Sequence, residues 1–104
     1  TLTGTEHAPD AVATVEAFDR GAGFSIVLDV AGLSPAPDDG YYEGWVGSVD
    51  GDEVGVGTFH MRGGDDTVVL WSGVDLAVYT TLVVRAVGPD GVGDTVLSGA
   101  FVAP

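Results

Sequence analysis

The strongest constraint on the fold is a strict alternation of side chains along residues 24–31. The segment reads FSIVLDVA, so that Phe, Ile, Leu and Val occupy every second position while Asp29 falls among the others. Only a pleated strand places the first set on one face and Asp29 in water. The segment therefore predicts a β-strand with one face in the core.

Six further stretches read as strands, and turn-forming residues separate each from the next. No segment shows an apolar period of three to four residues with a cap, so we expect no helix. Short strands at this spacing predict one all-β domain over residues 1–104, an antiparallel β-sandwich of about seven strands with immunoglobulin-like architecture. Residues 1–10 are expected to form a loose N-terminal segment. The expected strands are 11–18, 24–31, 41–49, 54–60, 67–72, 79–87 and 95–102.

The connections carry distinct turn chemistry. Residues 19–23 are a glycine-rich hairpin turn, and residues 88–91 (GPDG) form a second one. Between the second and third strands, Pro35 and Pro37 lack amide donors and precede Asp-Asp-Gly, which predicts a loop crossing between the sheets. Residues 62–66 are expected to turn the chain as well.

The charge balance narrows the possible partners. Lys and Arg together number three and the acidic residues 16, which gives a formal net charge of −13. This negative charge disfavours binding to nucleic acid and to anionic lipid. The charge is expected mainly to keep an apolar-rich domain soluble. No apolar run is long enough for a membrane helix, and because the chain begins with Thr1 we expect a processed chain or an excised domain.

The chain has few side chains of the types that usually act in catalysis. The chain has no cysteine, and its two histidines are His7, in the N-terminal segment, and His60, at a strand end. Two widely separated histidines do not make a zinc site, and no serine lies in a strand–turn–helix elbow. We therefore expect no catalytic residue, metal or cofactor, and a protein that is not an enzyme.

The acidic turns and the aromatic side chains leave two alternatives open, a calcium site and a ligand-binding surface. Residues 50–53 (DGDE) would hold Ca²⁺ if a second loop supplied further oxygens, although aspartate is favoured in turns for local reasons alone, as at Asp38 and Asp39. The nine aromatic residues are spread along the strands, as expected for a core, with a ligand surface as the alternative. Tyr41 and Trp45 share one face of their strand and Tyr42 takes the other, so one set must be less buried.

Residue order from 24 to 59 resembles the extracytoplasmic domain of anti-sigma-K factors. Leu33-Ser34-Pro35 stands where that family has a Gly-Leu-Pro loop, with one residue inserted. Tyr42-Glu43-Gly44-Trp45 resembles its Tyr-x-Leu-Trp element, except that Gly44 replaces the leucine, and Gly57-Thr58-Phe59 matches its Gly-x-Phe strand end. The motif residues are Leu33, Pro35, Tyr42, Trp45, Gly57 and Phe59.

The resemblance implies structural roles for these residues. Trp45 would anchor the core, Leu33 would plug the end of the sheet, and Gly57 would admit a neighbouring ring. If Trp45 is core, Trp45→Ala should cost about 3–5 kcal/mol.

The resemblance also implies a function. The parent would be a single-pass membrane regulator whose cytoplasmic segment, absent from these residues, holds a sigma factor inactive until proteolysis releases it. This domain would lie on the outer face of the membrane as a non-catalytic sensory part, with an extracytoplasmic protein or protease as its partner. The alternative is a secreted or surface-attached binding module for carbohydrate, peptide or calcium.

Overall fold

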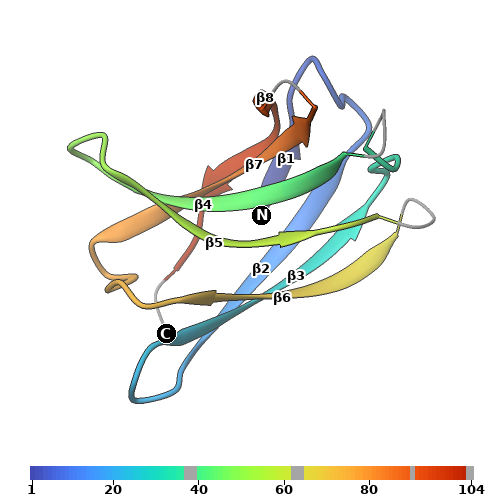
Figure 1. The fold of residues 1–104 in the computed structure, drawn as a ribbon. Coiled ribbons are helices and arrows are strands. Elements are labelled where there is room, and N and C mark those ends of the chain that lie inside the picture. The colour runs from blue at the N-terminus through green and yellow to red at the C-terminus, as the bar shows by residue number, and fades with distance from the viewer. Residues whose placement is uncertain (37–39, 62–64, 90, 103–104) are drawn as a thin grey trace.

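The computed structural model describes residues 1–36, 40–61, 65–89 and 91–102 and contains eight β-strands in these ranges (Figure 1). No helix able to cross a membrane occurs in this part of the chain. The predicted Pro37, Asp38 and Asp39 of the crossing loop, and residues 62–64 and 90 of the two turns, lie outside the described residues. The strands are β1 (Leu2–Gly4), β2 (Val12–Asp19), β3 (Phe24–Ala31), β4 (Tyr41–Ser48), β5 (Glu53–Phe59), β6 (Asp66–Ser72), β7 (Tyr79–Gly88) and β8 (Gly91–Ala100).

All eight strands belong to a single antiparallel sheet in the order β5-β4-β7-β8-β1-β2-β3-β6. The all-β prediction is confirmed. The sheet folds over so that β5-β4-β7-β8 faces β2-β3-β6, and its two end strands, β5 and β6, lie side by side (Figure 1). The result is a nearly closed, barrel-like sheet rather than the seven-strand sandwich predicted, because β1 joins the two halves.

The predicted loose N-terminal segment is wrong. Thr3 pairs with Val12 of β2 on one side and with Ser98 of β8 on the other, and Leu2 is completely buried. The segment after β1 is tied down as well, because the main-chain N–H groups of Gly4 and Thr5 donate to carbonyl oxygens of Ala11 and Val96 at 2.8 and 3.0 Å. A three-residue strand is too short to show a period in sequence, which explains the error.

The alternation predicted for residues 24–31 is confirmed. Ile26, Leu28 and Val30 are buried while Asp29 is exposed, and the same pattern holds in β7, where Leu82 and Val84 have no exposed surface. The core between the two halves of the sheet also contains Leu2, Leu33, Tyr42, Val46, Val56, Phe59, Met61, Leu70, Leu76, Val96, Leu97 and Phe101.

The sheet closes where Leu70 of β6 packs over two glycines. A Cβ atom at Gly44 would lie 2.7 Å from Leu70 Cδ1, and one at Gly57 would lie 3.0 Å from Leu70 Cδ2. Gly57 has φ of 141°, which side chains disfavour, and it pairs with Gly44 beside a bulge that leaves Val56 without a partner on β4. The close neighbour of Gly57 is therefore an aliphatic side chain and not the ring that was predicted.

Candidate functional site

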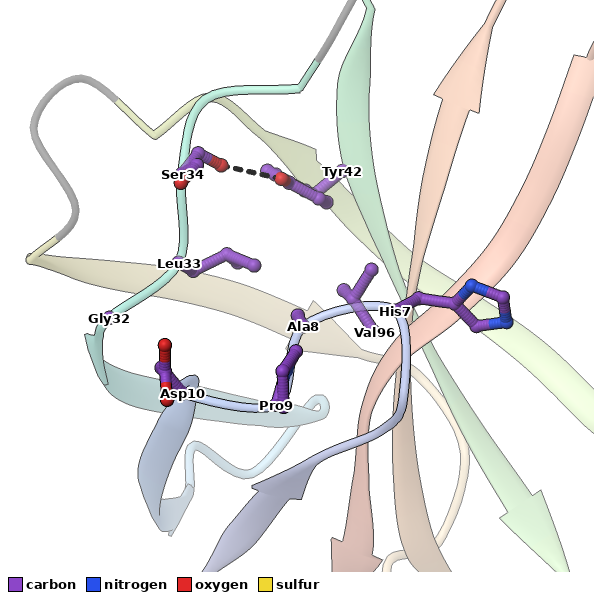
Figure 2. A pocket seen from close by; sticks show the side chains of 9 residues that line it. All are labelled: His7, Ala8, Pro9, Asp10, Gly32, Leu33, Ser34, Tyr42 and Val96. Atoms are coloured by element: carbon purple, nitrogen blue, oxygen red, sulfur yellow. Dashed lines mark hydrogen bonds between the residues drawn. The ribbon is translucent and has the colours of Figure 1, made fainter.

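Three motif residues meet around the loop that leaves β3. The rings of Tyr42 and Phe59 pack with centroids 5.7 Å apart, and both side chains are buried, as is Leu33. The Tyr42 hydroxyl donates to the main-chain oxygen of Ser34 at 2.5 Å, which fastens the loop to β4 (Figure 2). Leu33 is thus part of the core, while Pro35 is exposed beside it.

A cavity of about 220 Å³ lies next to this cluster, between the N-terminal loop and the loop after β3 (Figure 2). Its apolar lining includes Leu33 and Val96, and its polar lining includes His7, Asp10 and Tyr42. The Tyr42 hydroxyl is already bonded to the main-chain oxygen of Ser34. The cavity is lined mainly by residues of these two loops.

Burial of the Tyr42 phenol raises its pKa above the ordinary value of 10.0. Because the raised folded pKa favours the neutral form, the associated stability is present below about pH 10 and is lost as pH rises through the folded pKa. Tyr42→Phe should cost about 1 kcal/mol near neutrality and should make unfolding less sensitive to pH above about pH 10. Denaturant unfolding at several pH values measures both effects, and an alkaline loss of stability that is unchanged in Tyr42→Phe would contradict the assignment to Tyr42.

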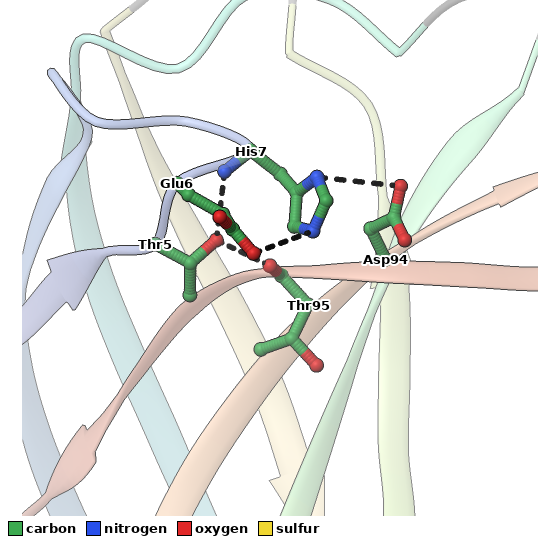
Figure 3. A network of polar contacts seen from close by, with 5 residues as sticks. All are labelled: Thr5, Glu6, His7, Asp94 and Thr95. Atoms are coloured by element: carbon green, nitrogen blue, oxygen red, sulfur yellow. Dashed lines mark hydrogen bonds and ion pairs between the residues drawn. The ribbon is translucent and has the colours of Figure 1, made fainter.

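His7 takes part in a polar network at the surface (Figure 3). Its Nδ1 lies 3.5 Å from a carboxylate oxygen of Asp94, and its Nε2 lies 3.7 Å from one of Glu6. Its main-chain N–H donates to Thr5 Oγ1, which in turn donates to the carbonyl oxygen of Thr95. These contacts fix the N-terminal loop onto β8.

The other histidine lies in a different environment. His60 meets the ring of Tyr41 edge to face, with centroids 6.1 Å apart. Within the described residues, neither imidazole is hydrogen-bonded to a serine or threonine side chain, and no group of three or more His, Asp or Glu side chains is placed to hold a metal ion.

The core role predicted for Trp45 is wrong. Its side chain is half-buried on the outer face of β4, where the Arg85 guanidinium carbon lies 5.8 Å from the ring centroid and Arg85 makes a bidentate ion pair with Glu53 at 3.1 and 2.8 Å. Tyr41 is exposed on this same face, whereas Tyr42 is buried. The alternation of β4 therefore buries Tyr42 and leaves Trp45 outside.

Trp45→Ala should consequently cost about 1–2 kcal/mol, less than a core tryptophan. Trp45 Nε1 is buried and reaches no described acceptor, which reduces the net stabilisation from this side chain. Thermal and denaturant unfolding of the variant measure the loss. A cost near 4 kcal/mol would show that the ring is held as firmly as a core residue.

Three acidic side chains in or next to the turns are bound to other groups of the protein. Asp65 Oδ1 accepts from the main-chain N–H of Gly32 at 3.1 Å, and Asp66 Oδ1 accepts from that of Thr67 at 2.8 Å. In the turn considered for Ca²⁺, Glu53 is paired with Arg85, and Gly51 has φ of 90° in a tight reversal. The Asp66 hydrogen bond and the positive φ of Gly51 are local features of the kind for which aspartate and glycine are favoured in turns.

The opposite outer face, formed by β2, β3 and β6, contains a row that was not predicted. Phe18, Ser25 and Trp71 lie side by side across the three strands, and Arg20 extends over Phe18. Trp71 was expected in the core because the aromatic residues are spread one or two to a strand, with a ligand surface as the alternative. In TVVLWS both sets of alternate positions contain large apolar residues, so the sequence does not show which set is exposed.

No protein-family model, curated protein or solved structure matches the chain. The functional argument therefore rests on the residues and on their arrangement in the fold.

Proposed function

We propose that this chain is the outer, regulatory domain of a membrane-anchored anti-sigma factor of the sigma-K type. The proposal is supported by the order of the motif residues in sequence and, in the fold, by the packing of Leu33, Tyr42 and Phe59 around the crossing loop. The observation that carries the proposal is the hydrogen bond from the Tyr42 hydroxyl to Ser34, because it explains why the motif has a tyrosine on the strand next to this loop.

In this role the domain performs no chemistry. It would lie on the outer face of the membrane and control access of a protease to the chain preceding Thr1. Because β1 is held by both β2 and β8, that chain would leave the fold from a strand anchored on two sides. A folded domain would then shield the adjoining segment, and loss of the fold would expose it to cleavage, because proteases act on locally open chain.

The test places the complete regulator in its host with a reporter gene for its sigma factor. Leu2→Ala, which weakens the attachment of β1, should raise reporter activity several-fold, whereas Thr3→Ala, at an exposed position of the same strand, should leave it unchanged. Reporter activity that is the same with Leu2→Ala as with the parent would contradict the proposal. So would a parent gene that encodes neither a membrane helix nor a segment that binds a sigma factor.

A further inference from the structure

The outer face of β2, β3 and β6 exposes a tryptophan among both polar and apolar side chains. Trp71 is 49% exposed, and Val69, two residues earlier on the same face, is 65% exposed. The ladder places Trp71 opposite Ser25, and Ser25 opposite Phe18, so that the three side chains form one row across the sheet. Trp71, Val69 and Phe18 thus form a contiguous group on this face, and a contiguous exposed apolar group is more informative about binding than a single exposed residue.

The indole of Trp71 rests against the glycine-rich turn. A Cβ atom at Gly23 would lie 2.6 Å from Trp71 Cζ2 and 2.9 Å from Cε2, so that the ring occupies the space left by the missing side chain. Gly23 is buried beneath it. The contact holds the ring in place while half of the side chain remains in solvent, and a ring held in this way loses little conformational freedom when a ligand stacks on it.

Arg20 lies at the end of the same row. Its guanidinium carbon is 5.1 Å from the centroid of the Phe18 ring, and its Nε donates to Ser25 Oγ at 3.0 Å. Both Nη groups remain available as donors, because among the described residues no carboxylate lies within ion-pair distance of Arg20. Arg85 on the opposite face differs in having both Nη groups bound to Glu53.

Hydrogen-bond acceptors lie on the same face. Glu16 precedes Phe18 by two residues on β2, and Asp29 lies in the row formed by Thr14, Asp29 and Thr67. The face thus combines a fixed aromatic ring, a positioned donor with free N–H groups, and exposed carboxylates and hydroxyls. A ligand suited to it has one apolar surface and many hydroxyl groups.

We propose that this face binds an uncharged oligosaccharide, with the C–H surface of a pyranose ring stacked on Trp71 and its hydroxyls accepting hydrogen bonds from Arg20 Nη1 and Nη2. The net charge of −13 disfavours acidic sugars, nucleic acid and anionic lipid, whereas it has no effect on a neutral chain. A second copy is disfavoured because two chains that each have a net charge of −13 repel each other. The inference does not depend on the regulatory function proposed above.

The test uses the two indole N–H signals that a protein with two tryptophans shows in its ¹H–¹⁵N spectrum. Trp45→Phe assigns them, because only the Trp71 signal remains. Cellohexaose, hexa-N-acetylchitohexaose and mannohexaose are then titrated separately into the labelled protein. At least one of these neutral probes should shift the Trp71 signal, and the Trp45 signal, on the opposite face, should stay in place.

Variants then connect the shift to the proposed contacts. With the probe that binds, Trp71→Ala should weaken affinity by at least about ten-fold and Arg20→Gln by about three-fold or more, measured by calorimetry, as truncation of a central aromatic or Arg contact generally does. Trp45→Phe and Arg85→Gln, on the other face, serve as matched controls that should keep the parent affinity. The thermal midpoint of each variant confirms that it is folded.

Several results would overturn the proposal. These are a Trp71 signal that moves with none of the three neutral probes, equal weakening by Arg85→Gln and Arg20→Gln, and tighter binding of an oligogalacturonate than of any neutral hexasaccharide. A Trp71 signal that shifts with protein concentration alone would identify the face as a contact between copies instead.

Discussion

Replacing Leu70 with alanine should lower the free energy of unfolding by about 3–4 kcal/mol. Leu70 is almost completely buried and fills the space above Gly44 and Gly57, where β6 meets β4 and β5. No ladder pairing joins β5 to β6 in the sheet, so side-chain packing such as that of Leu70 holds these two strands together. Because the two glycines offer no atoms to fill the space, the neighbourhood has little capacity to collapse around a smaller residue.

Denaturant unfolding of Leu70→Ala measures this loss, and Val69→Ala, at the exposed neighbouring position, is the matched control with an expected change below about 0.5 kcal/mol.

Gly44→Ala adds a methyl group 2.7 Å from Leu70 Cδ1 and should cost about 1–2 kcal/mol by overpacking. In the double variant the new methyl group occupies space that Leu70 has left. The two costs should therefore sum to more than the cost of the double variant. Strict additivity would show that Leu70 and Gly44 do not share this space.

Leu2→Ala should be the second most damaging of these substitutions, with a loss of about 3 kcal/mol. Leu2 has no exposed surface, and it packs on Gly99 of β8, where a Cβ atom would lie 3.1 Å from Leu2 Cδ2. β1 offers only a few ladder pairs to β2 and β8, so the buried leucine supplies much of what keeps the strand in place between them. Without β1, both of its neighbours would expose an unpaired edge.

Equilibrium unfolding again provides the measurement, with Thr3→Ala as the control, since Thr3 is exposed in the same strand. Limited proteolysis adds a local readout, because a loosened β1 should be cut earlier than the rest of the chain. If Leu2→Ala and Thr3→Ala are equally stable, then β1 is not a significant part of the core.

The parts of the fold that sequence predicts are those in which one face of a strand is apolar and the other is polar. β3 meets that condition, and its predicted range and buried face agree with the structure. In β4 and β6 both faces contain large apolar residues, and the alternation alone does not say which face is buried. Trp45 was placed in the core from the family resemblance and Trp71 from the spread of aromatic residues over the strands, and both lie on outer faces.

The row on the outer face depends on register, which the sequence does not reveal. Ser25 and Trp71 become neighbours only because β3 pairs with β6, and Arg20 reaches the row from a hairpin turn. The same limit applies to Leu70 and its two glycines, which come from three separate strands. A glycine within a strand indicates that something packs closely on the main chain, but it does not identify the neighbour.

The position of β5 and β6 also bears on the behaviour of the protein at high concentration. Each has one side without a partner in the sheet, and unpaired strand edges are the usual starting points for intermolecular β-structure and fibrils. Here the two edges are turned toward each other, and the bulge at Val56 with Gly57 makes β5 irregular. The exposure of a fibril-forming template should therefore depend on transient separation of β5 from β6, which Leu70 opposes.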